Sequence, residues 1–441
     1  MPINILHITP HLGGGVGRVV LNYLLKAKEN NGFSHSIICL DFANENAISV
    51  TTQNNIPLKE KCAQNPSLII QEIEKADVVL VHWWNHPLLY DFLVRQDIPL
   101  SRIIFWSHIS GFHPPYVFTE KALCYPDFFV FTTPLSFECE EVKNFSGDKS
   151  KFHTVWSTGG LEHIKPSASE KDNKNFNIGY IGTVDYCKIH PDFLQICSKI
   201  NIPNAKFIVC GGSSHKEVEE EAKKLGIADK FEFTGLVSDI NTKLFEFDIF
   251  GYPLAPYHYG TCDQVLAESM AAGVVPVVLG NPMEKYMVKD KETGLVAKDI
   301  EEYISLIELL YKDSSYRQKL SEKAKNYAYN IFSLEKMVKD WEEIFYNILK
   351  IPKSDKKWDL SNKYVEELSP ADIFLEALGD YGELFRIFME TNNEESKNLA
   401  LQKIKDFTDS PIWKAKTRGT PQHYFSFFGE DENLKIWSGL E

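Results

Sequence analysis

The sequence predicts an α/β protein with two successive parallel sheets, each covered by helices, and a mostly helical C-terminal extension. Short apolar runs typical of buried strands alternate with segments whose apolar residues recur at helical spacing. The alternation restarts after a polar, proline-bearing run at 165–176, so the two sheets belong to separate units. A chain of 441 residues is also too long for a single hydrophobic core.

The first unit, 1–165, begins with an apolar run at 3–10, which is followed by glycines and then by a helix. A second strand, HSIICLD, completes a βαβ beginning, and this order implies a parallel sheet. Ligands of such sheets bind beyond the carboxyl ends of the strands. The further strand candidates of this unit are ADVVLVHWW, RIIFWSH and DFFVFTT, at 76–84, 102–108 and 127–133.

The second unit, 176–333, repeats the alternation without detectable sequence repetition. Helical segments at 215–225 and 263–272 separate its strands, and from 299 the chain turns helical, with Asp299 as the expected N-cap. The strand candidates are NIGYIGTVD, KFIVCGGSS, KFEFTGLVS, DIFGYPLAP, VPVVLGN and TGLVAKD.

A last long helix is expected at 334–349 within the segment 334–350, because apolar residues recur on one side of it. The run IPKSDKKWD that follows reads as a second linker. The extension, 352–441, contains a helix start with Ser369 at the N-cap and Pro370 at the first helical position. Its aromatic residues predict a small helical cap whose role the sequence does not identify.

Composition excludes several classes of protein. The formal net charge of -14 argues against a dominant nucleic-acid surface, because phosphate neutralisation needs clustered Lys and Arg. No run of about 18 apolar residues could span a bilayer, and the N-terminus resembles a strand rather than a signal peptide. The 8 cysteines include no C-x-x-C pair, so reduced core cysteines and a cytoplasmic location are expected.

The run HLGGGVGR at 11–18 joins the first strand to the first helix. Consecutive glycines at Gly13, Gly14 and Gly15 let backbone N–H groups approach an anion at the helix N-terminus, which favours a phosphate. A tight turn without a ligand is the alternative. A dinucleotide fingerprint, with Asp41 as the ribose-binding acid, fits less well because the glycine spacing departs from G-x-G-x-x-G.

Two charged residues of the second unit are candidates for a donor site. Lys188 lies six residues beyond Gly182, the glycine that ends the first strand, and an ammonium suits a diphosphate. Glu268 lies among small and apolar residues of one helix, where it could accept hydrogen bonds from the vicinal hydroxyls of a ribose. The alternatives are a solvated surface lysine and a carboxylate that only complements the helix dipole.

These features together resemble the GT-B glycosyltransferases of family four. The resemblance rests on the two α/β units, the glycine loop, the lysine and the run LAESMAAGVVPVVLGNPMEKYMVKDKETGLVA, and it covers roughly residues 3–349. It implies two Rossmann-like domains facing across a cleft, with a nucleotide sugar bound between them. It also implies that the helix at 334–350 packs back on the first domain.

The resemblance implies a role for each matched residue. Lys188 would hold the donor diphosphate, Glu268 the nucleotide ribose, and the loop of Gly13, Gly14 and Gly15 the distal phosphate and sugar. His108 matches the histidine that lies close to the donor sugar in the family; taken alone, it is equally a hydrogen-bonded buried histidine.

The chain departs from the family at two donor-site positions. Gly260 stands eight residues before Glu268, where the family usually has an acidic residue. Thr183 follows Gly182, where the family usually has an arginine. We expect Asp263 to take over contacts to the sugar hydroxyls, with Thr261 and Cys262 offering backbone N–H groups to phosphate. Loss of turnover and altered donor choice are the alternatives.

The resulting prediction is a retaining, hexosyltransferase-like enzyme that moves a sugar from a nucleotide-diphosphate donor to an acceptor hydroxyl in glycan or polysaccharide synthesis. No metal ion or other cofactor is predicted, because no D-x-D pair and no zinc-ligand spacing occurs. No protein nucleophile is predicted either, because the acceptor hydroxyl would attack on the leaving-group face, where a phosphate oxygen can take its proton. The acceptor would be a glycan or a lipid-linked molecule, and peripheral membrane contact through HWWNHPLLYDFLV is an option. A nucleotide-sugar 2-epimerase and a noncatalytic sugar-nucleotide-binding subunit are the alternatives.

Overall fold

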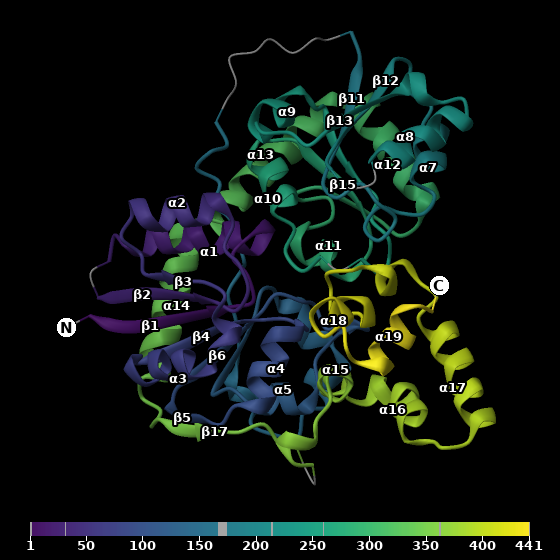
Figure 1. Ribbon diagram of the computed structural model, residues 1–441. Coiled ribbons are helices and arrows are strands. Elements are labelled where there is room, and N and C mark those ends of the chain that lie inside the picture. Colours follow the sequence, from purple (N-terminus) through teal and green to yellow (C-terminus); the bar gives the residue numbers. More distant parts are fainter. Residues whose placement is uncertain are drawn as a thin grey trace. The chain divides into compact units, whose positions relative to one another are not determined.

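The computed structural model describes residues 2–30, 32–165, 174–212, 215–258, 260–360 and 363–440. The chain forms two compact units. Unit 1 contains the residues up to Gly159 and those from Met337 onward, and unit 2 is Gly160–Lys336. Each unit contains a parallel sheet with helices around it (Figure 1), so the predicted α/β fold class is confirmed. Residues 166–173 of the first predicted linker lie outside the described residues.

The sheet of unit 1 has the strand order β10-β9-β6-β4-β1-β2-β3, and neighbouring strands are parallel. Each strand predicted in this unit is present, and a short antiparallel pair, β7 (Phe112–His113) and β8 (Tyr116–Val117), follows β6. The strands are β1 (Ile3–Thr9), β2 (Phe33–Cys39), β3 (Leu58–Lys59), β4 (Val78–Trp83), β6 (Ile103–Ser107), β9 (Phe128–Phe131) and β10 (Phe152–Thr154).

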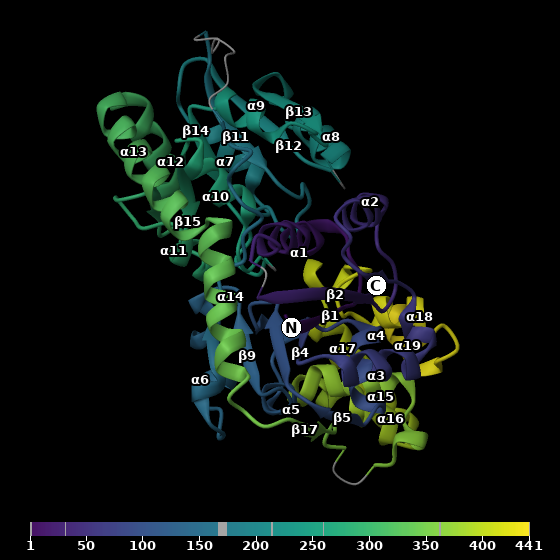
Figure 2. The ribbon, with the colours of Figure 1, turned by 90° about the vertical axis from the view of Figure 1, so that its left-hand side faces the viewer.

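Helices cover both faces of this sheet (Figure 2). On one face, Tyr23 of α1 lies 6.1 Å from the ring of His7, and Trp341 of α14 lies 4.9 Å from the ring of Trp106. On the other face, the ring centroids of Tyr90 in α4 and Trp83 lie 6.1 Å apart. The helices are α1 (Gly14–Ala27), α2 (Glu45–Gln53), α3 (Pro66–Lys75), α4 (Pro87–Arg95), α5 (Glu120–Cys124), α6 (Glu140–Lys143) and α14 (Leu334–Ile348).

The C-terminal extension packs against α4 through two of its helices, α15 and α18 (Figure 1). Ser369 caps α15 and forms a capping box with Asp372, as the sequence predicted for the helix start. The aromatic core of the extension is built around Phe374, whose ring contacts those of Tyr424 and Trp437. The helices are α15 (Pro370–Leu378), α16 (Glu383–Glu390), α17 (Glu394–Phe407), α18 (Pro421–Phe427) and α19 (Glu432–Ser438).

The predicted second linker, IPKSDKKWD, is wrong. Its residues form β17 (Ser354–Lys356), which pairs antiparallel with β5 (Ile98–Ser101). Trp358 is buried, and its ring centroid lies 5.6 Å from that of Tyr90. The Lys356 ammonium lies 2.6 Å from Asp127 Oδ1. The segment is charged in sequence, but the buried tryptophan and the half-buried ion pair fix it to unit 1.

The sheet of unit 2 has the order β13-β12-β11-β14-β15-β16, and its paired strands are parallel. Its strands are β11 (Phe176–Ile181), β12 (Ala205–Cys210), β13 (Phe231–Gly235), β14 (Ile249–Tyr252), β15 (Val275–Leu279) and β16 (Leu295–Ala297). Right-handed crossovers in opposite directions place α7 and α10 on opposite faces of this sheet. Asp299 caps α12, as predicted. The helices are α7 (Phe193–Lys199), α8 (His215–Lys224), α9 (Ile240–Glu246), α10 (Gln264–Ala271), α11 (Pro282–Met287), α12 (Ile300–Lys312) and α13 (Ser314–Ile331).

Candidate functional site

Each sheet has a point at which its strand order reverses direction. In unit 1 this point lies between β1 and β4, and in unit 2 between β11 and β14. Ligands of open parallel sheets bind at such points, outside the carboxyl ends of the strands. The predicted site residues follow the ends of these strands. The glycine loop follows β1, Gly182, Thr183 and Lys188 follow β11, and Gly260 to Glu268 follow β14.

In unit 2, Lys188 and Asp263 form a buried ion pair. The ammonium lies 3.1 Å from Asp263 Oδ1, and the Tyr252 hydroxyl donates to Asp263 Oδ2 at 2.8 Å. Both charged side chains are only 10% exposed. Burial alone would raise the pKa of Asp263, but the charges of Lys188 and His258 and the hydrogen bonds from Tyr252 and Lys188 lower it below its ordinary value. Asp263 is therefore a carboxylate at pH 7, and it holds the lysine in place.

Gly260 leaves room for this carboxylate. A Cβ on Gly260 would lie 2.8 Å from Asp263 Oδ1, which is closer than Cβ contacts in proteins, and 3.0 Å from His258 Nδ1, which is tighter than most such contacts. The backbone N–H of Gly260 donates to His258 Nδ1 at 3.0 Å, and His258 Nε2 lies 2.9 Å from the buried Glu284. The missing acidic residue at 260 and the carboxylate of Asp263 are thus alternatives for the same space.

Glu268 lies within α10 beyond its first turn and is buried. The helix-dipole explanation therefore does not apply, because that effect is confined to the terminal turns. The carboxylate lies 3.1 Å from His163 Nε2, and the His163 side chain is 38% exposed. The buried carboxylate therefore contacts an imidazole that is partly open to solvent.

Two glycines bring the ends of β11 and β12 together. A Cβ on Gly211 would lie 1.7 Å from the carbonyl oxygen of Gly182, so the two turns could not approach with any other residue. The Tyr180 hydroxyl donates to the carbonyl of Thr183 at 2.7 Å. The backbone N–H of Gly182 donates to the carbonyl of Cys210 at 3.0 Å, so this turn is held against the neighbouring strand. Thr261 is half-buried between Gly260 and Asp263.

In unit 1, the glycine loop forms the N-terminus of α1. Gly13 is the N-cap and no side chain caps the helix, so the first N–H groups are left to backbone or ligand partners. Gly14 has φ +61°, and a Cβ on Gly14 or Gly15 would meet nothing within 4 Å. Gly13 and Gly14 also line a small cavity of about 110 Å³ with Arg18 and Asn44.

His108 follows β6 in unit 1 and is half-buried. Its Nε2 lies 3.1 Å from Nδ1 of His82, and its ring contacts those of Trp106 and Trp84. Burial lowers the pKa of His108 to about 3, so the imidazole is neutral at pH 7. The structure thus places His108 in a hydrogen-bonded pair, and this leaves its Nδ1 as the free ring nitrogen within the described part of the chain.

Sequence reasoning missed three residues of the unit 2 site: Tyr252, His258 and Glu284. Tyr252 is the last residue of β14, and His258 follows it in the loop that leads to Gly260. The position of Tyr252 at the carboxyl end of a predicted strand was a usable signal. His258 and Glu284 offered none, because their contact depends on the path of two loops.

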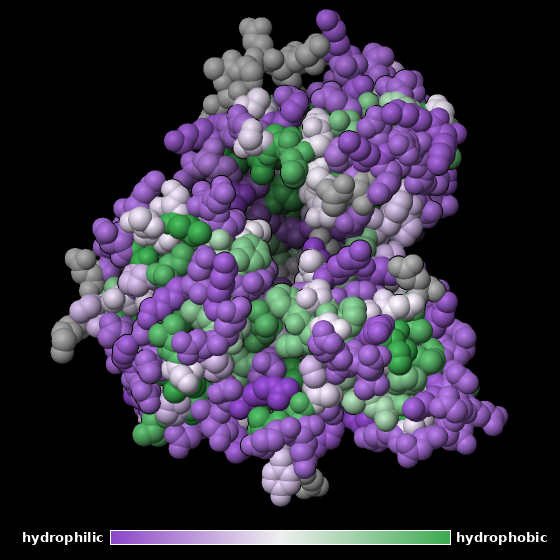
Figure 3. Space-filling model, in the orientation of Figure 1, coloured by the Kyte–Doolittle hydropathy of each residue, from purple (hydrophilic) through white to green (hydrophobic). Residues whose placement is uncertain are grey.

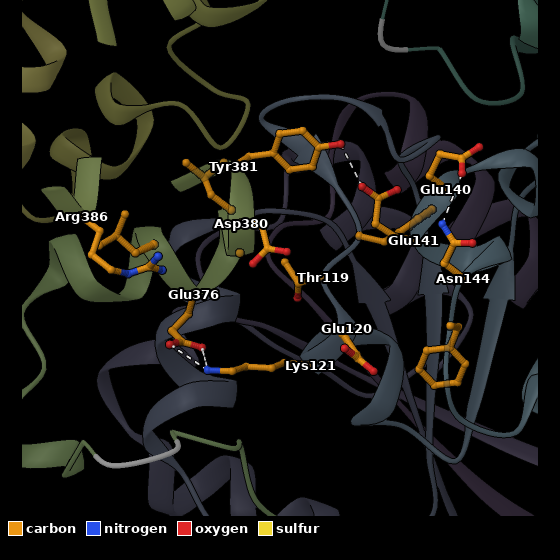
Figure 4. A pocket seen from close by; sticks show the side chains of 15 residues that line it. Thr119, Glu120, Lys121, Glu140, Glu141, Asn144, Glu376, Asp380, Tyr381 and Arg386 are labelled. Atoms are coloured by element: carbon orange, nitrogen blue, oxygen red, sulfur yellow. Dashed lines mark hydrogen bonds and ion pairs between the residues drawn. The ribbon is translucent and has the colours of Figure 1, made fainter. Parts of the chain in front are cut away.

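A separate cavity of about 570 Å³ lies in unit 1 between the C-terminal extension and α5 and α6 (Figure 4). Acidic side chains dominate its lining. Lys121 pairs with Glu376 at 2.8 Å, and the Tyr381 hydroxyl donates to Glu141 at 2.9 Å. None of the predicted site residues lines this cavity, so it is distinct from the candidate site.

The stretch 82–94 does not present exposed aromatic residues. Trp83, Trp84, Tyr90 and Phe92 are all buried, so this basis for peripheral membrane contact is wrong. Among the described helices, none combines the length and the apolar character that a bilayer span requires. On the face in Figure 3, apolar residues are interspersed among hydrophilic ones. Five of the eight cysteines are buried, and the eight are reduced, as expected.

The second unit also matches known proteins in sequence. Residues 162–327 match the sequence model of the family described as Glycosyl transferases group 1, which is less than half of the chain. No curated protein sequence matches the chain.

Solved structures match most of the chain. A glycosyltransferase from Rickettsia africae is 16% identical, with a TM-score of 0.64, and the match covers 79% of this chain and 99% of that one. Anabaena HepE in complex with UDP and glucose is 13% identical, with a TM-score of 0.63, covering 78% and 100%. TarM is 9% identical, with a TM-score of 0.65, covering 78% and 99%. The GT-B fold and the resemblance seen in the sequence motifs are confirmed.

Proposed function

We propose that this protein is a retaining glycosyltransferase that moves a sugar from a nucleotide-diphosphate donor to an acceptor hydroxyl. The observation that carries the proposal is the buried pair of Lys188 and Asp263 beyond the carboxyl ends of β11 and β14. It lies inside the segment that matches the glycosyl transferases group 1 family. A lysine held in a buried position by a carboxylate is a fixed positive charge, which suits a diphosphate.

Each unit carries its own proposed contacts to the donor. Lys188 would bind the diphosphate, Glu268 the ribose hydroxyls, and the N–H groups of Gly13, Gly14 and Gly15 the distal phosphate and sugar. HepE has been solved with UDP and with UDP-glucose, and these complexes support uridine diphosphate sugars as the first donors to test.

The chemistry needs charge stabilisation at the leaving group. Breaking the anomeric C–O bond leaves negative charge on the departing diphosphate, and Lys188 with the loop N–H groups would stabilise it. Preorganised donors of this kind contribute about 3 kcal/mol each to lowering a barrier. The acceptor hydroxyl would attack on the leaving-group face and give its proton to a phosphate oxygen, so no protein nucleophile and no metal ion is required.

The acceptor is proposed to be a glycan or a lipid-linked molecule. WaaG, a matched structure, is a glycosyltransferase involved in lipopolysaccharide biosynthesis, which supports a role in glycan or polysaccharide synthesis. Flotation with anionic and neutral vesicles would test peripheral membrane contact separately from catalysis.

The test is release of nucleoside diphosphate from radiolabelled nucleotide sugars, with and without a mixture of glycan acceptors. We expect sugar transfer with unchanged anomeric configuration, and unchanged rates in the presence of a chelator. Lys188→Ala and Glu268→Ala should lower the rate about 100-fold, whereas Lys291→Ala, on a side chain that is 73% exposed, should not.

Each alternative has its own outcome in this assay. Epimerisation of the donor sugar in the absence of an acceptor would show that the protein is a nucleotide-sugar 2-epimerase and not a transferase. Donor binding in thermal-shift assays without turnover would favour the noncatalytic subunit. Unchanged transfer by both Lys188→Ala and Glu268→Ala would refute the site.

A further inference from the structure

Four histidines of unit 1 form one hydrogen-bonded row across the sheet. His35 Nδ1 lies 3.0 Å from His7 Nε2, His7 Nδ1 lies 3.0 Å from His82 Nε2, and His82 Nδ1 lies 3.1 Å from His108 Nε2. The histidine row therefore joins β2, β1 and β4 to the loop after β6. Its inner members, His7 and His82, are fully buried.

Strand register explains why the four rings meet. His35 is paired with Ile5, so His7 lies two residues farther along; His7 is paired with Leu80, so His82 lies two residues farther again. His82 is paired with Trp106, two residues before His108. Residues two apart share a face of a sheet, so each step keeps the face and moves toward the carboxyl edge. The histidine row thus runs diagonally from the interior of the sheet to its ligand-binding edge.

All four rings are neutral at pH 7. Burial lowers the pKa of His35 to about 4 and that of His108 to about 3. Burial, followed by the neighbouring imidazoles, lowers the pKa of His7 and of His82 well below the ordinary value. A neutral imidazole has one N–H donor and one acceptor nitrogen, so every hydrogen bond in the histidine row must point the same way.

The two directions differ at the ends of the histidine row. In one, every ring carries its proton on Nδ1, and the spare N–H lies on His108. In the other, every ring carries its proton on Nε2, and the spare N–H lies on His35. His35 Nε2 is buried without a hydrogen-bond partner among the described residues. Buried N–H groups without acceptors are rarer than unsatisfied acceptors, so the first direction is the more stable one.

We propose that the histidine row is a single directional chain that fixes His108 in the Nδ1–H tautomer, so that His108 donates a hydrogen bond from Nδ1 to a substrate oxygen. His35, His7 and His82 are then positioning residues, and His108 contacts the substrate as a donor rather than as a general base. The contact with substrate rests on the proposed glycosyl transfer, but the tautomer does not.

Nuclear magnetic resonance of protein with 15N-labelled histidine tests the tautomer without any substrate. We expect the 15N shifts of His35, His7, His82 and His108 to report protonation on Nδ1. Three other histidines are internal references, because Nδ1 accepts a backbone N–H in His86, His190 and His423 and their proton must lie on Nε2. Protonation of His108 on Nε2, or a mixture of tautomers, would overturn the proposal.

A substitution at His35, the end of the histidine row farthest from His108, tests whether the tautomer of His108 depends on the other rings. His35→Asp replaces a donor with a carboxylate that accepts a hydrogen bond from the Nε2–H of His7. This should reverse the histidine row and move the His108 proton from Nδ1 to Nε2. His35→Asn, which keeps a donor at the same position, should leave the His108 signal unchanged. An unchanged His108 tautomer in folded His35→Asp would contradict the coupling, and the wild-type spectrum decides the proposal if that variant does not fold.

Substrate contact is tested by the matched pair His108→Asn and His108→Asp. Asparagine keeps an N–H donor near the Nδ1 position and aspartate does not, so kcat/KM should fall about 100-fold more in His108→Asp. Equal loss in both variants would show that the donor is not used. Absence of transfer by the wild-type protein with the expected tautomer would refute the proposed function and leave the histidine row intact.

Discussion

The two sheets carry different kinds of residues at the points where their strand order reverses. Unit 2 gathers Lys188, Asp263 and Glu268, which are buried and charged, whereas unit 1 gathers glycines and neutral histidines. A buried charge must be paired, so the unit 2 site depends on a few ion contacts. The unit 1 site carries no charge, so it depends on backbone conformation and on the direction of its hydrogen bonds. The two sites should therefore respond to different kinds of substitution.

Restoring the acidic residue at 260 should have the largest effect. The side chain of Gly260→Asp has to displace Asp263, which lies 2.8 Å from the new Cβ, and the Lys188 pair is lost. Breaking a buried pair costs about 4 kcal/mol of unfolding free energy, and sugar transfer should fall about 100-fold. Both quantities would be measured on the purified variant, with Gly260→Ala to separate the added Cβ from the added charge.

The double variant Gly260→Asp, Asp263→Gly is the control. The carboxylate then occupies the family position, and glycine is tolerated at the N-cap of α10 at a cost of only a few tenths of a kcal/mol, so most of the activity should return. If the double variant is no better than the single one, the two positions are not alternatives for the same function.

Asp263→Asn should have the next largest effect, because it removes the charge and keeps the shape. Lys188 loses its buried anion, which should cost about 3 kcal/mol of unfolding free energy at pH 7. The pKa of Asp263 is lowered in the folded protein, so its contribution is complete above the unfolded pKa of about 3.9 and is lost as the pH falls through the folded value.

Urea unfolding at several pH values between 7 and 3 measures this prediction. The difference between wild type and Asp263→Asn should be constant from pH 7 to about pH 5 and should narrow at lower pH. A difference that grows at low pH would contradict the assigned ion pair. Full sugar transfer by Asp263→Asn would leave the departure at Gly260 without a functional explanation.

In unit 1, we expect stability to depend on hydrogen bonds and not on charge. His82→Leu leaves His7 Nδ1 and His108 Nε2 without partners in the histidine row, and this should lower the unfolding free energy by about 2 kcal/mol. His153→Leu is the matched control in the same sheet, because His153 Nε2 is buried without a partner. Equal destabilisation by both variants would show that the hydrogen bonds do not matter.

The succession of strands and helices along the chain, the caps at Ser369 and Asp299, and the glycine loop were predictable because they depend on neighbours in sequence. The proximity of the Asp263 carboxylate to Gly260 was also predictable, since the two residues are three positions apart. The histidine row was not, because His35, His7, His82 and His108 meet only when four segments adopt one register. The packed segment at Ser354–Lys356 was missed for a similar reason: its partner strand lies about 250 residues earlier.

The smallest effect should come from the glycine loop. Substituting two adjacent glycines one at a time distinguishes the need for an unusual backbone conformation from the need for space beside a ligand. Gly14 has φ +61°, so Gly14→Ala should cost about 1 kcal/mol of unfolding free energy, whereas Gly15→Ala has no such strain and should not lower stability. A Cβ on either residue projects into open space, where the donor phosphate is proposed to lie. Gly15→Ala should therefore weaken donor binding in thermal-shift titrations while leaving the ligand-free melting temperature unchanged. If donor binding by Gly15→Ala equals that of wild type, the glycines serve only the turn, and the anion contacts of the protein lie in unit 2 alone.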